Sequence, residues 1–174
     1  MNCNRVSPPR LGIDIGGVII SRSVDDSSDT SFFAGTMSAA LMTPPSVGVF
    51  EHLPVLVQRF EQNVWLISKA GPVIQAKTLR WLDHHRFYER TGVPRGNIRF
   101  CRQRAEKADH CRELWITHFI DDRSDVLQHL EGLVSHRYLF GPSDGKLSDP
   151  LVRQLASWSE ASIKVWPAGT RDTP

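Results

Sequence analysis

Short apolar runs alternate with amphipathic stretches along most of this chain. The runs hold mainly β-branched, leucine and aromatic side chains, a composition typical of strands buried inside a parallel sheet. The runs that predict strands are 11–20, 64–67, 98–101, 116–120 and 137–140, with a further edge strand at 163–166.

Between these runs, apolar residues recur at the spacing of amphipathic helices. Helices are predicted at 49–60, at 73–85 with an extra turn over 86–91, from near Lys107, at 125–131, and from Ser148-Asp149-Pro150 onward. Pro54 should kink or split the first of them, because proline has no N–H to donate. The inward residues are expected to be Ile74, Leu79 and Leu82 in the second helix and Leu151, Leu155 and Trp158 in the last.

Strands that alternate with helices predict βαβ units. The expected fold class is therefore α/β, a Rossmann-like three-layer sandwich with a central, mainly parallel sheet. We expect one domain over 11–166, an N-terminal arm over 1–10 and a loose tail over 167–174. The polar segment 21–43 is too long for a simple connector and is interpreted as a flap or loop insertion, in which Phe32-Phe33 could pack against the site.

Composition narrows the class of protein. The chain has 174 residues, of which 40% are hydrophobic and 23% charged, with a mean hydropathy of −0.28. A net charge of +2 is too mild to predict nucleic-acid binding. No apolar run approaches the ~18 residues of a membrane span, and the start lacks a signal-peptide core. Three scattered cysteines suit free thiols, so we expect a cytoplasmic protein.

Polar residues follow several of the predicted strands. Asp14 and the Gly16-Gly17 pair lie within the first run, Ser68 follows the second, and Asp121-Asp122 follow the fourth. Lys107 comes shortly after the third. Because ligands of parallel α/β sheets bind outside the carboxyl ends of the strands, these residues predict one common site.

The residue types in this set suit magnesium and phosphate. Mg²⁺ prefers oxygen ligands, commonly one or two carboxylates with water and phosphate. Lys107 can neutralise phosphoryl oxygens, Ser68 can hydrogen-bond one of them, and Asp14 can attack phosphorus to form an aspartyl-phosphate. Simpler interpretations stay open: Ser68 and Asp121-Asp122 can cap turns or helices, and Lys107 can be a solvated lysine. The histidines and cysteines lack the spacing of a zinc site.

In order and type, these motifs resemble the haloacid dehalogenase (HAD) superfamily over about 11–125. The resemblance implies Mg²⁺ as cofactor and, from the spacings, a capless or minimally capped member. It implies Asp14, Ser68 and Lys107 as catalytic residues, with the metal held by Asp14, the Gly16 backbone carbonyl, Asp121 and Asp122. The candidate substrate-binding residues are Gly17, Ser68, Lys69, Arg102, Arg104 and Arg123.

Gly16 departs from the family pattern. HAD phosphatases usually carry there a second Asp that protonates the leaving group and later activates water, help worth about 10²–10⁴-fold. Three outcomes remain: a leaving group that needs little protonation, such as an acyl or aryl group, another acid such as Asp25, Asp26 or Asp29, or binding without turnover. The expected partner is a phosphorylated small molecule or phosphoprotein, and the alternative is a non-catalytic binding or regulatory protein on the same fold.

Overall fold

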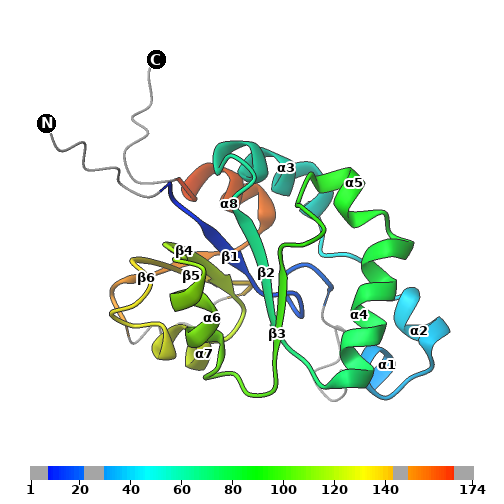
Figure 1. Cartoon of the computed structure of the whole chain (residues 1–174). Coiled ribbons are helices and arrows are strands. Elements are labelled where there is room, and N and C mark those ends of the chain that lie inside the picture. The colour runs from blue at the N-terminus through cyan, green and yellow to red at the C-terminus, as the bar shows by residue number, and fades with distance from the viewer. Residues whose placement is uncertain (1–7, 22–29, 143–148, 167–174) are drawn as a thin grey trace, which may run out of the picture.

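A six-stranded sheet forms the centre of the computed structural model, which describes residues 8–21, 30–142 and 149–166 (Figure 1). All adjacent strands run parallel, in the order β3-β2-β1-β4-β5-β6. The strands are β1 (Leu11–Ile13), β2 (Val64–Lys69), β3 (Ile98–Cys101), β4 (His118–Asp121), β5 (His136–Phe140) and β6 (Val152–Leu155). This arrangement confirms the predicted α/β, Rossmann-like fold class.

The strand order reverses at β1, which lies between β2 and β4. Leu11 pairs with Val64 of β2 on one side and with His118 of β4 on the other. The chain builds β2 and β3 outward from β1 and then returns to add β4 on the opposite side. Such a switch point leaves a crevice at the carboxyl ends of the central strands, because the connections on either side lead away from each other.

Helices cover both faces of the sheet, as a doubly wound fold requires. One apolar core joins α3, α4, α5 and α8 to one face, and a second core joins α6 and α7 to the other. The helices are α1 (Thr30–Phe33), α2 (Met37–Leu41), α3 (Val49–Arg59), α4 (Pro72–His84), α5 (Phe87–Thr91), α6 (Lys107–Glu113), α7 (Ser124–His129) and α8 (Trp158–Lys164).

Pro54 does not split helix α3, which was one of the two effects expected of it. The helix runs from Val49 to Arg59 without a break, although Pro54 lies inside it. Pro54 is the sixth helical residue, and it removes one helical hydrogen bond, to the carbonyl four residues earlier. Burial of Val49, Leu53, Leu56 and Val57 holds the helix against the core on both sides of the proline.

The C-terminal segment corrects another expectation. The predicted helix from Ser148-Asp149-Pro150 is instead strand β6 followed by α8, and the predicted strand at 163–166 begins inside α8. Val152 and Leu155 are buried where β6 pairs with β5, so sheet pairing outweighs the helical spacing of the apolar residues. Ser157 caps α8 by accepting a hydrogen bond from the Glu160 N–H at 3.2 Å.

The buried face of α4 also differs from the expected one. Leu79 is 42% exposed, whereas Trp81 and Leu82 are fully buried. Lys77 and Thr78 take the buried positions one turn earlier. The expected arm and tail fall largely outside the described residues. The expected flap is described only in part, as α1 and α2, which lie beside α4 (Figure 1).

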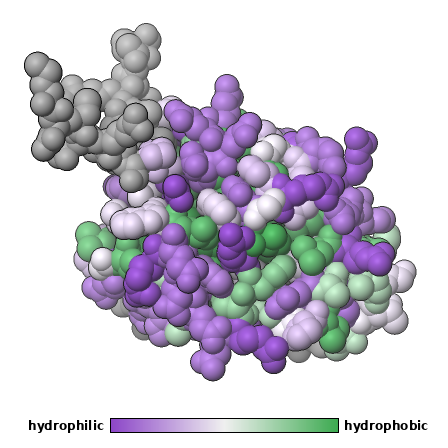
Figure 2. All heavy atoms as spheres, in the orientation of Figure 1, coloured by the Kyte–Doolittle hydropathy of each residue, from purple (hydrophilic) through white to green (hydrophobic). Residues whose placement is uncertain are grey.

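Figure 2 shows mostly hydrophilic residues on one face of the molecule, with hydrophobic residues visible in a band across its middle. Single exposed hydrophobic side chains such as Trp115 and Leu151 are common on globular proteins. In the described part of the chain, no helix is both long enough and apolar enough to cross a membrane.

His118 packs at the amino end of β4, away from the strand ends that carry the acidic residues. Its ring nitrogens lie 2.8 Å from Thr117 Oγ1 and 2.8 Å from the Trp166 carbonyl oxygen. The ring stacks on His136, with centroids 4.3 Å apart. Burial, and then the neighbouring His136, lower the pKa of His118 to about 4. We therefore interpret His118 as a neutral structural residue.

We predict that this buried histidine makes the fold sensitive to acid. The unfolded chain protonates His118 near pH 6.5 and the folded chain only near pH 4, so the unfolded state binds more protons between these values. The free energy of unfolding should fall as the pH drops through this window, by up to about 3 kcal/mol from His118. Urea unfolding of wild type and His118→Gln at pH 7 and pH 5 measures the effect. The loss of unfolding free energy between pH 7 and pH 5 should be smaller in His118→Gln than in wild type. It should equal the wild-type loss in the control His129→Gln, whose side chain is exposed.

We also predict that Gly12 must remain glycine. A Cβ atom at Gly12 would lie 2.5 Å from Cδ2 and 2.6 Å from Cε2 of the buried Phe119 ring. Gly12→Ala should lower the free energy of unfolding by about 1–3 kcal/mol, the usual cost of overpacking a core. Urea unfolding checks this. Gly96→Ala is the matched control, since nothing lies within 4 Å of its Cβ position, and an equal loss in both variants would contradict the steric argument.

Candidate active site

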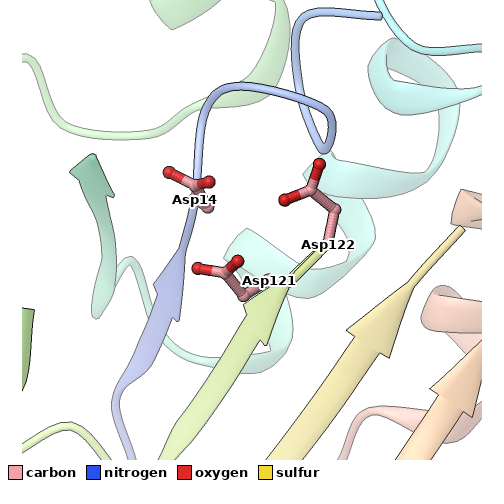
Figure 3. A group of neighbouring side chains, drawn as sticks. All are labelled: Asp14, Asp121 and Asp122. Carbon is pink, nitrogen blue, oxygen red and sulfur yellow. The ribbon is translucent and has the colours of Figure 1, made fainter. Parts of the chain in front are cut away.

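The carboxyl ends of the central strands bring the predicted acidic residues together. Asp14 directly follows β1, Asp121 is the last residue of β4, and Asp122 comes next (Figure 3). One carboxylate oxygen from each lies within 4.8 Å of the others. Because β1 and β4 are paired neighbours, this approach follows directly from the sheet order.

A tight turn after Asp14 shapes the rim of the site. The Asp14 N–H continues the sheet ladder to the Ile120 carbonyl, and the chain then folds back, so that the Ile19 and Ile20 N–H groups both donate to the Ile15 carbonyl. Gly17 has a φ of 78°, a left-handed conformation that favours glycine. The strand predicted over 11–20 therefore ends at Ile13. Val18–Ile20, after the turn, are buried and hold the turn against the core.

Lys107 carries its ammonium group into the centre of the acidic cluster. Its Nζ donates to Asp121 Oδ2 at 2.7 Å and lies 2.9 Å from Asp14 Oδ1, and the residue is 2% exposed. Burial alone lowers the pKa of Lys107, but the carboxylates of Asp14 and Asp121 outweigh it and raise the pKa above its ordinary value. Lys107 is therefore a charged residue of the site and not a solvated lysine.

The loop before α6 holds Lys107 in place. The Glu106 carboxylate accepts hydrogen bonds from the Arg102 N–H at 2.8 Å and the Gln103 N–H at 3.3 Å. This closes the turn between β3 and α6, so that the first residue of the helix points its side chain back to the sheet. The sequence showed Lys107 near a helix start, but not this side-chain support.

Asp121 and Asp122 have different surroundings. Asp121 is fully buried, and its two oxygens accept from Lys107 and, at 3.0 Å, from the Arg123 N–H. Burial and then Asp14 raise the pKa of Asp121, and Lys107 partly offsets them. Asp122 lines the cleft together with Asp14. Asp121 is thus best placed to hold Lys107, and Asp122 to face a ligand.

The charges and donors of this cluster fit a divalent cation. Three carboxylates stand against one buried ammonium, a formal excess of two negative charges when all three are ionised. The oxygen donors are of the kind that Mg²⁺ prefers, and two of the three residues are buried. Burial and then the Asp14 carboxylate raise the pKa of Asp121, and a dication would oppose both effects because it favours ionised carboxylates.

Next to the cluster lies a cleft of about 340 Å³. Its polar lining residues include most of the predicted site: Asp14, Gly16, Gly17, Ser68, Lys69, Arg104, Lys107, Asp122 and Arg123. Its apolar lining residues come from the turn after β1, from α1 and from α4: Ile15, Ile20, Phe32, Phe33 and Ile74. The cleft therefore combines a charged part with an apolar part.

Two arginines line the cleft and share one acidic partner. Arg123 Nε donates to Asp125 Oδ1 at 3.1 Å, and Arg104 lies 3.9 Å from Asp125 Oδ2. The structure does not bring Arg102 to the cleft, since its side chain is exposed and it is not among the lining residues. Substrate binding by Arg104 and Arg123 stays a prediction that their placement supports.

Sequence reasoning missed the contribution of α4. Thr78 lines the cleft, and its neighbour Lys77 is buried, 5% exposed, against the segment that carries Phe32 and Phe33. Lys77, Trp81 and His85 recur one helical turn apart, but this spacing alone does not show that Lys77 is buried. Local sequence does not distinguish a polar residue on the buried face of a helix from one that faces solvent.

Comparison with known proteins identifies a fold but no close relative. No protein-family model matches the chain, and no curated protein matches it. Among solved structures, the chain is similar to the crystal structure of a haloacid dehalogenase-like family hydrolase from Xanthomonas campestris. The two share 11% sequence identity and a TM-score of 0.58, over 89% of this chain and 93% of that one. At this identity the likeness concerns the fold: this chain has the fold of a HAD-like hydrolase.

Proposed function

We propose that the protein is a magnesium-dependent phosphohydrolase that acts on a phosphorylated small molecule through an aspartyl-phosphate on Asp14. The observation that carries the proposal is the Lys107 ammonium, buried between Asp14 and Asp121 beside a cleft that Asp122 also lines. The volume of the cleft, about 340 Å³, falls in the range of small-molecule sites.

In the proposed reaction, an oxygen of Asp14 attacks phosphorus while the bond from phosphorus to the leaving oxygen breaks. Water then attacks the same phosphorus and the bond from phosphorus to the Asp14 oxygen breaks, which restores the Asp14 carboxylate; one proton of the water stays on the released phosphate and the other goes to solvent. Lys107 and the Ser68 hydroxyl stabilise the negative charge that develops on the phosphoryl oxygens. Asp14, Asp122 and the Gly16 carbonyl would hold Mg²⁺, which supplies further charge neutralisation when bound, and Asp121 would orient Lys107.

The cleft offers few acids that could protonate a leaving group, and this restricts which substrates can react. Among the described residues that line it, the carboxylates are Asp14 and Asp122, which the proposal assigns to the nucleophile and the metal. Asp25, Asp26 and Asp29 lie outside the described residues. A leaving group that departs as a stable anion needs no proton, so we propose aryl and acyl phosphates as substrates.

The alternative is a protein that binds a phosphorylated ligand without turnover. Gly16 is the specific observation in its favour, because it stands at the usual position of the general acid and base. A test must therefore measure binding as well as hydrolysis.

We predict that Asp14→Asn abolishes hydrolysis. An amide is a far weaker nucleophile than a carboxylate, so turnover of p-nitrophenyl phosphate with Mg²⁺ should fall by more than about 10³-fold. Initial rates measure this, and Asp109→Asn is the matched control, since Asp109 is exposed on α6 and pairs with Arg112.

Binding is measured in parallel by ¹⁹F NMR with Mg²⁺ and beryllium fluoride, a mimic of the phosphoryl group. Wild type should show a bound fluoride signal that Asp14→Asn lacks. Hydrolysis that persists in Asp14→Asn would refute the mechanism. A bound signal without turnover of any aryl or acyl phosphate would favour the binding protein.

We further predict that Gly16→Asp extends activity to alkyl phosphates. No atom lies within 4 Å of a Cβ at Gly16, so the side chain can be accommodated. A general acid is typically worth 10²–10⁴-fold, and an imperfectly placed one should still raise alkyl phosphate turnover at least about tenfold relative to aryl phosphate. The quantity compared is kcat/KM for glycerol phosphate divided by kcat/KM for phenyl phosphate. Gly16→Asn, of similar shape but with an amide that is neither an acid nor a base near neutral pH, should not raise this ratio.

A further inference from the structure

Side chains on one face of α4 and at its C-terminal end contact backbone carbonyls of the segment between β1 and α3. Trp81 Nε1 donates to the Thr43 carbonyl at 2.8 Å, and His85 Nε2 lies 3.0 Å from the Leu41 carbonyl. Lys77, one turn before Trp81, contacts the same segment nearer to the cleft. Residues four apart lie above one another on a helix, so the three form one row. Figure 1 shows α1 and α2 beside this helix.

Lys77 makes the densest of these contacts. Its ammonium donates to the carbonyls of Phe32 at 2.9 Å, Phe33 at 3.0 Å and Gly35 at 2.6 Å. These three bonds use the full donor capacity of an ammonium group. They gather the carbonyls at the end of α1, where a positive charge is favourable, and compensate the burial of the charge.

These bonds place two aromatic rings at the cleft. Phe32 is buried and Phe33 is 45% exposed, with ring centroids 5.9 Å apart in an edge-to-face arrangement. Both line the cleft together with Ile74, which is on α4 one turn before Lys77. The helix that carries Lys77 thus supplies part of the apolar lining and holds the rest in place.

We propose that Lys77 is a positioning residue for an apolar subsite formed by Phe32, Phe33 and Ile74, and that this subsite binds an aromatic leaving group. The inference rests on the proposed function and names its substrate class: aryl phosphates in preference to small acyl phosphates. Aromatic and aliphatic side chains offer an aromatic group dispersion contacts and burial, but little to a short polar chain. The charged part of the same cleft takes the phosphoryl group.

The test compares substrates that differ only in the group bound to the phosphate. Lys77→Met removes the ammonium while it keeps a flexible apolar chain. The ratio of kcat/KM for 1-naphthyl phosphate over acetyl phosphate should fall about tenfold or more, since lost pocket contacts cost discrimination of this order. Lys77→Arg, which keeps donors for the carbonyls, should restore much of the ratio. Arg80→Met is the matched control, since it removes a charge from an exposed position of the same helix and should leave the ratio unchanged.

A binding measurement keeps this inference separate from catalysis. Titration calorimetry with Mg²⁺ compares phenylphosphonate with methylphosphonate, neither of which is hydrolysed. Wild type should bind the phenyl compound more tightly, and Lys77→Met should lose that preference. This result without turnover of any phosphate would overturn the hydrolase proposal and leave the subsite standing.

A second variant tests the subsite independently, in case Lys77→Met does not fold. Phe33 is partly exposed, so Phe33→Ala should fold and show the same loss of aryl preference. If Lys77→Met and Phe33→Ala keep the wild-type ratio for both pairs of compounds, or if wild type shows no aryl preference, the subsite does not exist.

Discussion

The ion pairs of Lys107 with Asp14 and Asp121 are the constraint on which the active-site geometry depends. They join three elements that are far apart in sequence: the end of β1, the start of α6 and the end of β4. A buried ammonium without anionic partners would be costly, and so would the two carboxylates without it. The groups therefore stabilise one another only in this arrangement. The doubly wound sheet makes it possible, because its switch point leaves the ends of β1 and β4 open and side by side.

The same interaction accounts for the chemistry that we propose. One positive charge does not balance three carboxylates, and the remainder suits a dication and a phosphoryl group that arrive together. Asp121 is enclosed and already bonded to Lys107 and the Arg123 N–H, whereas Asp14 and Asp122 line the cleft. The three carboxylates can thus divide the work of nucleophile, metal ligand and support for the lysine, although the sequence presents Asp121 and Asp122 as an undifferentiated pair.

Two buried lysines illustrate how partners decide the role of a charge. Lys107 faces carboxylates and belongs to the phosphate end of the cleft. The described hydrogen bonds of Lys77 go to three carbonyl oxygens, so it acts on the backbone of the segment beside α1. Side-chain-to-backbone bonds hold that segment whatever its own side chains are.

From Val49 to Phe140 the sequence by itself determined the order of strands and helices, and it indicated the residues of the charged site, but it predicted a loop where α1 and α2 lie. Apolar runs mark buried strands in any context, and the open ends of parallel strands must share one edge of the sheet. Only the tertiary structure decided that 152–155 joins the sheet and that Trp81 and not Leu79 faces inward. It also decided that Arg102 does not line the cleft and that Lys77 binds the backbone carbonyl of Phe32. The physical reason is that a strand at the edge, the rotation of a helix and the partner of a buried lysine depend on groups distant in sequence, which no local pattern records.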